Sequence, residues 1–517
     1  MTAPAEHSTV GTSPPASTFQ WHKAAWIALA ILCLAQLVDT IDVTIVNVTL
    51  PAIKNGLGFS ETGLQWVVNA YTVFYGGFIL LGGRVGDLAG RRRVFMISVT
   101  VFTAASLASG LAPDAGSLIA SRSVQGLAAA FMSPATLAIL ASTFPEGVAR
   151  NKAVAIWGTV SGVGGGLGVV IGGLLTSGPG WRWVFFINVP IGAAILILSP
   201  LFLQPGRAQA GPRRFDLGGA VTATGGAGLL AYALVENGSF LWRMIFFAAA
   251  LLLIVAFVIT ESRATDPLVP FAMFRNRAVA GANIVAPLIG ASTFAMFFFI
   301  SLYEQQVLGY SALGTAVVYL PLTGAFIVGS GLSPQIVPKM GVRGGLVIGS
   351  ALAAIGLVLL ARLKPDVSIG ISVIMPSVII GIGLGLTFVP LSLASVSRVE
   401  RGATGLASGM MNATRLVGGA LGLALIVGIA IDRASHLLPG RSLTKAADLL
   451  SAPHLSSASK AALVSGFHFG FLVAAALLAL AAVTAAVVFR KEGRGEAVNM
   501  MEIMNASMES PDSKANS

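Results

Sequence analysis

The stretch Gly82-Gly83-Arg84-Val85-Gly86-Asp87-Leu88-Ala89-Gly90-Arg91-Arg92-Arg93 decides how the rest of this chain is organised. It is a dense group of charged residues in a strongly hydrophobic sequence. On each side lies an apolar run of about 20 residues, the length that a helix needs to cross the core of a bilayer. We therefore expect the stretch to be a short loop between two membrane spans. Its arginines indicate the cytoplasmic side, because inner loops collect Lys and Arg.

The composition indicates a polytopic membrane protein. Of the 517 residues, 55% are hydrophobic and only 10% are charged, which excludes a water-soluble globule with a polar shell. The net charge of +11 would suit a nucleic-acid partner, but the basic residues fall in short loops between apolar runs. Positive-inside topology explains them better, so we expect a lipid bilayer and no nucleic acid as partner. The single cysteine, Cys33, excludes an intramolecular disulfide.

Apolar runs of membrane-spanning length predict an all-α fold of about 14 transmembrane helices. An even number of spans places both termini on the cytoplasmic side of the inner membrane. Alternate loops then carry 21 of the 32 Lys and Arg residues inside and 9 outside. The predicted spans centre near residues 37, 74, 103, 128, 165, 194, 225, 252, 290, 322, 353, 381, 417 and 478.

A faint internal repeat predicts two halves of six helices each. The glycine-rich stretch 163–168 is echoed by 417–422, and Lys339-Met340-Gly341-Val342-Arg343 is a degenerate copy of the arginine stretch. Repeats of this kind place a substrate site between the halves. Chance recurrence of Gly and Ala in membrane helices is the alternative. The predicted segments are a disordered cytoplasmic tail at 1–22, an N-terminal half at 23–205, a two-helix insert at 206–265, a C-terminal half at 266–490 and a second cytoplasmic tail at 491–517.

The first span carries two carboxylates, Asp39 and Asp42, which share one helix face at a spacing of three residues. Burying charge in a membrane is costly, so such residues face a bundle interior or a wet cavity. Like charges that close favour a proton on one of them, which is what a proton carrier requires. The alternative is a structural carboxylate satisfied by neighbouring amides. Gln36 and Asn47 on the same span are candidates for lining a substrate cavity.

Two further spans contain residues that predict specific contacts with neighbouring helices. Arg122 in span four lies below the membrane surface and predicts an internal carboxylate or carbonyl partner, with Gln125 a cavity candidate beside it. A purely structural clamp is the alternative. The glycines of span five predict close helix packing, and they include Gly164, Gly168, Gly172 and Gly173.

The second half offers three cavity candidates, Glu304, Asn412 and Arg415. Glu304 is either a solvated residue beyond the end of its span or a second protonatable group inside it. Asn412 and Arg415 are likewise either solvated residues or polar groups inside their span. Asn188 with Pro190 is interpreted as an interfacial anchor and a helix kink, and not as a ligand.

These motifs resemble those of the major facilitator superfamily. The pattern G-x-x-x-D-x-x-G-R-R-R is similar to its loop signature, with Leu88 in place of the usual basic residue. The stretch Asp42 to Pro51 resembles the first span of its fourteen-helix drug/proton antiporters, and Arg122 to Gly126 resembles the fourth-helix motif. The glycine stretch ending at Gly173 resembles the exporters' antiporter motif, with Val169 where they have proline.

The resemblance implies proton-driven export of drugs or antibiotics. Asp42 and Arg122 would then serve proton coupling together with Asp39. We also expect a charge-assisted latch of the access states at the arginine stretch, formed by Gly83, Asp87, Gly90, Arg91 and Arg92.

The expected ligands are a small amphipathic substrate and protons, handled by a monomer. No G-x-x-x-x-G-K-[ST] loop is present, so ATP is not expected to drive transport, and no cofactor or metal is predicted. An importer on the same scaffold is the alternative function. A membrane enzyme or receptor is a third hypothesis, which would need a soluble segment that no loop is long enough to supply.

Overall fold

Every regular element of the described residues is helical in this computed structural model. The structure describes residues 21–59, 61–145, 148–204, 217–235, 240–264, 267–364, 370–397, 399, 404–438 and 456–489. The predicted tails at 1–22 and 491–517 lie outside the described residues, apart from Trp21 and His22.

Thirteen described helices are long and apolar enough to cross a membrane, and one of them, α12, contains two of the predicted spans. The prediction of about 14 spans is therefore confirmed. The N-terminal helices are α1 (Lys23–Leu57), α2 (Glu61–Leu64), α3 (Trp66–Ala89), α4 (Arg91–Leu111), α5 (Ala115–Thr143), α6 (Val148–Ser177), α7 (Trp183–Phe186) and α8 (Asn188–Phe202). The central pair is α9 (Leu217–Val235) and α10 (Phe240–Arg263). The C-terminal helices are η1 (Phe271–Arg275), α11 (Arg277–Leu302), η2 (Tyr303–Val307), α12 (Ala312–Leu360), η3 (Gly370–Ile374), α13 (Met375–Val396), α14 (Thr404–Ser435) and α16 (Ser457–Val488).

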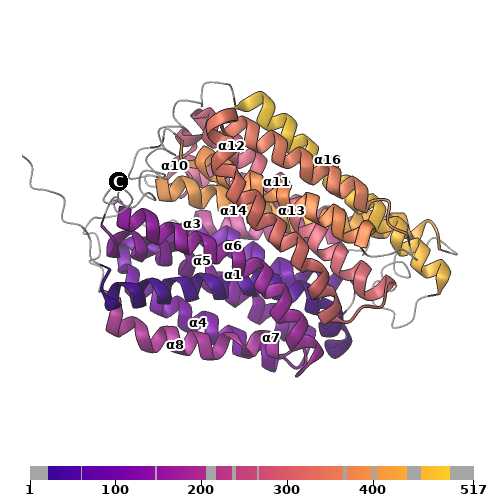
Figure 1. The fold of residues 1–517 in the computed structure, drawn as a ribbon, viewed down its shortest axis with the longest axis horizontal. Helices are drawn as coiled ribbons and strands as arrows, with labels where there is room; N and C mark the ends of the chain where they lie inside the picture. The colour runs from indigo at the N-terminus through magenta and orange to yellow at the C-terminus, as the bar shows by residue number, and fades with distance from the viewer. Residues whose placement is uncertain are drawn as a thin grey trace, which may run out of the picture.

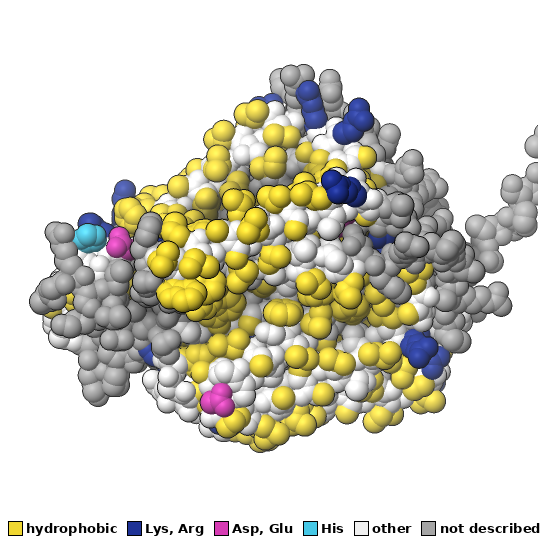
Figure 2. All heavy atoms as spheres, turned by 180° about the vertical axis from the view of Figure 1, so that it is seen from behind, with side chains coloured by type: hydrophobic (Ala, Val, Ile, Leu, Met, Phe, Trp, Pro, Cys, Tyr) yellow, Lys and Arg dark blue, Asp and Glu magenta, His cyan; other side chains and the backbone are white. Residues whose placement is uncertain are grey.

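The helices form two bundles that lie side by side (Figure 1). One bundle holds α1 to α8 and the other holds α11 to α16. The main helix pairs at the seam between them are α6 with α12 and α3 with α14, and α1 adds smaller contacts with α11 and α12. Apolar side chains cover the middle of the face drawn in Figure 2, and most of its charged side chains lie toward the edges. An apolar belt of this kind suits a surface that faces lipid.

The charged stretch differs from the predicted loop. Helix α3 runs through it to Ala89 and α4 begins at Arg91, so that only Gly90 lies between the two helices. Arg, Leu and Ala are good helix formers, which lets the helices extend into the stretch. Gly90 has φ 95°, a conformation that residues with a Cβ rarely adopt. Gly341 breaks α12 in the same way, with φ 71°, in the stretch identified as the degenerate copy.

Helix α6 packs closely on α1 because glycines line their contact. A Cβ added at Gly172 would lie 2.8 Å from the carbonyl oxygen of Ile45, and one at Gly168 would lie 2.9 Å from that of Ile41. Gly164 faces Leu37 and Thr40 in the same row. Gly173 points the other way, toward α12, where an added Cβ would lie 2.6 Å from the Ala312 carbonyl oxygen. One glycine row thus holds the first half together, and its neighbour contacts the second half.

Gly172→Ala is expected to destabilise the protein by about 1 to 3 kcal/mol, the usual cost of overpacking a close contact. The reason is that the new methyl group meets backbone, which cannot move aside as a flexible side chain can. Gly165→Ala is the matched control, because nothing lies within 4 Å of a Cβ at that position. Thermal unfolding of both variants in detergent measures the difference. Equal melting temperatures would contradict the packing account.

The central pair of helices covers one side of the seam. Helix α9 packs on both α3 and α14, with Thr224 filling the space beside Gly77 of α3. Helix α10 packs mainly on α9 and exposes most of its surface. The insert therefore contacts both halves mainly through α9.

Candidate substrate and proton site

A buried ion pair lies at the centre of the N-terminal bundle. Asp42 of α1 is fully buried, and Nη1 of Arg122 on α5 donates to its Oδ2 over 2.5 Å. The guanidinium Nε also donates to the Val67 carbonyl of α3 over 3.1 Å. Both kinds of partner expected for Arg122, a carboxylate and a carbonyl, are therefore present. A paired charge is far less costly in a membrane interior than an isolated one.

Two amides complete the coordination of Asp42. Gln125 Nε2 donates to its Oδ1 over 2.8 Å, and Asn188 Nδ2 of α8 donates to the same oxygen over 2.9 Å. Asn188 is also held by Ser106 of α4 over 2.9 Å. Asp42 thus joins side chains from α1, α5 and α8. The interpretation of Asn188 as a surface anchor differs from its place here, since it is 1% exposed and contacts the carboxylate directly.

Asp39 lies one turn along α1 and has different partners. Tyr71 donates to its Oδ1 over 2.9 Å and Tyr75 donates to its Oδ2 over 2.8 Å. Tyr71 also lies beneath Arg122, whose Cζ is 4.4 Å from the ring centroid. One tyrosine therefore links the two aspartates through a hydrogen bond on one side and a cation–π contact on the other. The two acids are neighbours, but each has its own set of donors.

Arg415 brings a cation toward this site from the other half. It lies on α14, which packs against α3, the helix that carries Tyr75, at the seam. Its nearest recorded polar contact is a long one of 3.5 Å to Asn412 Oδ1. No ion pair to Arg415 is formed within the part of the chain that the structure describes. The site therefore has one compensated charge pair in the first half, a second acid held by two tyrosines, and a cation on the seam helix of the other half.

Among the described residues, none of the remaining cavity candidates forms a hydrogen bond to Asp42. Gln36 and Asn47 bond to groups of their own helix, Thr40 and the Val43 carbonyl, both over 3.2 Å. Asn412 likewise donates to the Ser408 carbonyl of α14. Glu304 lies inside the second bundle in the π-helical segment η2, and it is fully buried. Of its two predicted environments, the interior one is the one observed.

The arginines of the charged stretch tie helix ends together. Arg91 donates to the Ala138 carbonyl of α5 over 3.3 Å, and Arg92 donates to the Pro200 carbonyl of α8 over 3.2 Å. Cations suit the C-terminal ends of helices, where carbonyl groups lack partners. An added Cβ at Gly83 would make only ordinary contact with Pro134. The side chain of Asp87 lies outside what the structure describes, and the latch remains a prediction.

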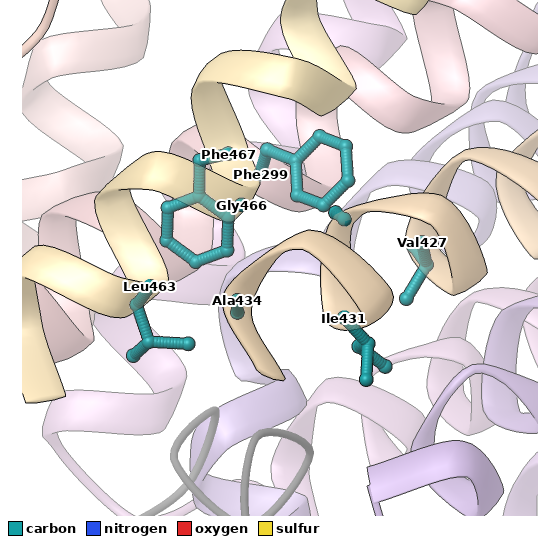
Figure 3. Close-up of a pocket in the computed structure, with 8 residues that line it drawn as sticks. Phe299, Val427, Ile431, Ala434, Leu463, Gly466 and Phe467 are labelled. Carbon is teal, nitrogen blue, oxygen red and sulfur yellow. The ribbon is translucent and has the colours of Figure 1, made fainter. Parts of the chain in front are cut away.

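A small apolar pocket opens elsewhere, between α11, α14 and α16 (Figure 3). Phe299, Ile431, Leu463 and Phe467 are among its lining residues. None of the polar residues above lines it. Among the described residues, no group of three or more His, Cys, Asp or Glu side chains could hold a metal ion.

Comparison with known proteins identifies the family. The sequence profile of the Major Facilitator Superfamily matches residues 32–223 and 215–423. The chain belongs to this superfamily. It is therefore a polytopic membrane transporter and not an enzyme, and the resemblance drawn from the motifs is confirmed.

Curated relatives carry names that concern antibiotics. The chain is 36% identical to the puromycin resistance protein pur8 of Streptomyces alboniger, over 88% of this chain and 90% of that one. It is 38% identical to the cephamycin export protein CmcT of Amycolatopsis lactamdurans, over 78% of this chain and 85% of that one. Among solved structures, a bacterial homolog of the human lysosomal transporter Spinster, inward-facing and unoccupied, superposes with a TM-score of 0.64. That structure covers 95% of this chain at 17% identity, all of its own chain is matched, and the likeness concerns the fold alone.

Tyr71, Tyr75 and Asn188 are the site residues that the sequence analysis did not predict. The two tyrosines are four residues apart in an apolar span, so they share a helix face, and this spacing is a signal that could have singled them out. For Asn188, the signal was an amide side chain at the start of an apolar run, a pattern that is also typical of an interfacial anchor.

Proposed function

We propose that this chain exports small amphipathic molecules, antibiotics among them, across the cytoplasmic membrane in exchange for protons. The observation that carries the proposal is the buried Asp42–Arg122 pair in a chain whose relatives are named for antibiotic resistance and export. The positive bias of alternate loops supports termini on the cytoplasmic side. The transporter acts as a monomer with its substrate site between the two halves.

Proton exchange at Asp42 supplies the coupling. While Asp42 is ionised, its charge is compensated by Arg122 and its oxygens are held by donors from α5 and α8. Protonation removes the attraction to the guanidinium, so Arg122 must find another acceptor or the helices must move apart. A proton on Asp42 therefore changes the relative stability of two helix arrangements, which is the requirement for alternating access.

The charges facing the seam bear on which substrates are accepted. Because Arg122 compensates Asp42, the groups left for a substrate are Asp39 and Arg415, one of each sign. A cation would approach the carboxylate and an anion the guanidinium, so amphipathic molecules of either sign, or zwitterions, suit the site. This differs from a site with two uncompensated acids, which would select cations strongly.

Export is tested in a drug-sensitive bacterial host. Expression of the chain should lower the accumulation of puromycin, which carries an amine, and of a cephamycin, which carries a carboxylate. Addition of a protonophore should restore accumulation of both, because the proton gradient is the energy source. Raised accumulation on expression would instead indicate import. Export that persists with the protonophore would contradict proton coupling.

A further inference from the structure

Glu304 is a buried acid that the mechanism at Asp42 does not use. It lies near the end of α11, in the π-helical segment η2, and is 0% exposed. Within the described part of the chain, neither of its carboxyl oxygens has a hydrogen-bond partner of good geometry. The hydroxyl of Thr315 on α12 faces the carboxyl group, but it too lacks a well-formed hydrogen bond.

Among the described residues, no cation forms an ion pair with this acid. Helices α11, α12 and α16 pack against η2. Titratable side chains on these elements include Tyr303 of η2, Tyr319 of α12, and His468 and Lys460 of α16, and Arg362 and Lys364 follow the end of α12. Tyr319 donates to the Phe297 carbonyl, Tyr303 to the Lys364 carbonyl, and His468 contacts the Leu363 carbonyl. On the α1 side, Lys54 is the only basic residue between the aspartates and the end of that helix. No ion pair or hydrogen bond joins any of these groups to Glu304 within the described residues.

The segment that holds Glu304 also closes the seam between the halves. The next residue, Gln305, donates from Nε2 to the Val48 carbonyl of α1 over 2.9 Å. Val48 lies on the same helix as Asp39 and Asp42. A movement that separates the bundles at this end breaks the Gln305 contact and changes the surroundings of Glu304 at the same time.

We propose that Glu304 is a second proton-binding site of the transporter, in the C-terminal half, and that it exchanges its proton when the contact between Gln305 and Val48 opens. An ionised carboxylate with no counter-ion and no good donor is very costly in a membrane interior, so the side chain holds a proton in the closed arrangement. Opening of the seam admits water, which stabilises the ionised form and accepts the proton.

This site extends the proposed proton coupling and rests on it, but the proton itself serves as the probe, so no substrate is needed. The full chain in lipid nanodiscs is compared with Glu304→Gln by infrared spectroscopy at neutral pH. The wild type should show a protonated-carboxyl band that the variant lacks. Glu261→Gln is the control, since Glu261 is also buried but accepts from the Val269 backbone N–H. The same band lost with Glu261→Gln, or no band lost with Glu304→Gln, would overturn the proposal.

The gate is tested by transfer into heavy water, which shifts the carboxyl band as its proton exchanges. Gln305→Ala should speed this exchange about fivefold, the factor that corresponds to the net worth of one hydrogen bond. Gln306→Ala is the matched control, because among the described residues this neighbouring glutamine on η2 forms no hydrogen bond to α1. Equal exchange in wild type and Gln305→Ala would overturn the gate, even if Glu304→Gln fails to fold. If the band and its exchange behave as expected but vesicles show no substrate-linked proton movement, the proposed function fails and the proton site stands.

Discussion

Asp42→Asn is expected to abolish substrate-linked proton movement while the protein still inserts and folds. Asparagine has nearly the shape of aspartate, and its oxygen can still accept from Arg122 Nη1. The new amide group replaces the oxygen that accepts from Gln125 Nε2 and Asn188 Nδ2, and rotation of the Asn188 amide brings its Oδ1, which has no partner in the described structure, into position to accept from it. What asparagine cannot do is bind and release a proton, and the charge change that links protons to helix movement is lost.

The measurement uses proteoliposomes that contain a pH-sensitive dye, to which puromycin is added. Wild type should show a puromycin-dependent change of internal pH, and Asp42→Asn should show only the leak of liposomes without protein. Asp432→Asn is the control, because it removes an exposed acid at the end of α14 that pairs only with His436 over 3.7 Å. Normal coupling with asparagine at position 42 would exclude Asp42 as the proton carrier.

The spans and the need for a buried ion pair could be predicted because membrane burial constrains both strongly. A run of 20 apolar residues is stable mainly as a membrane-spanning helix, and an arginine inside such a run requires a hydrogen-bond acceptor. The sequence therefore predicted that Arg122 has a partner. It did not identify Asp42 as that partner, because the pairing depends on how α1 and α5 are rotated toward each other.

Positions at helix ends were harder to predict. Glu304 lies where its span gives way to a loop, and a shift of one helical turn changes it from solvated to buried. The charged stretch shows the same limit, since the helices extend through it and turn at Gly90 alone. Tyr71 and Tyr75 were missed because aromatic residues in membrane spans usually only pack, and nothing local reveals an aspartate on the neighbouring helix.

Replacement of Arg122 is expected to have the largest effect on stability. Arg122→Gln leaves Asp42 buried without its counter-ion, so the carboxyl group must either remain ionised at a cost or take up a proton, and breaking a buried pair in this way typically costs about 3 to 5 kcal/mol. The variant also loses the stacking on Tyr71 and the bond to the Val67 carbonyl. Thermal unfolding in detergent should therefore show a lower melting temperature than for the wild type.

The double variant Asp42→Asn with Arg122→Gln separates the charge from the contacts. It has no uncompensated charge, so it should be more stable than Arg122→Gln alone, although it has lost both members of the pair. It should still fail to move protons, since no titratable group remains at position 42. If the double variant is as unstable as Arg122→Gln, the loss of stability arises from lost packing around Tyr71 and not from a buried charge without a counter-ion. In that case Arg122 acts as a structural clamp between α3 and α5, and the coupling role assigned to the pair falls to Asp42 with its amide donors.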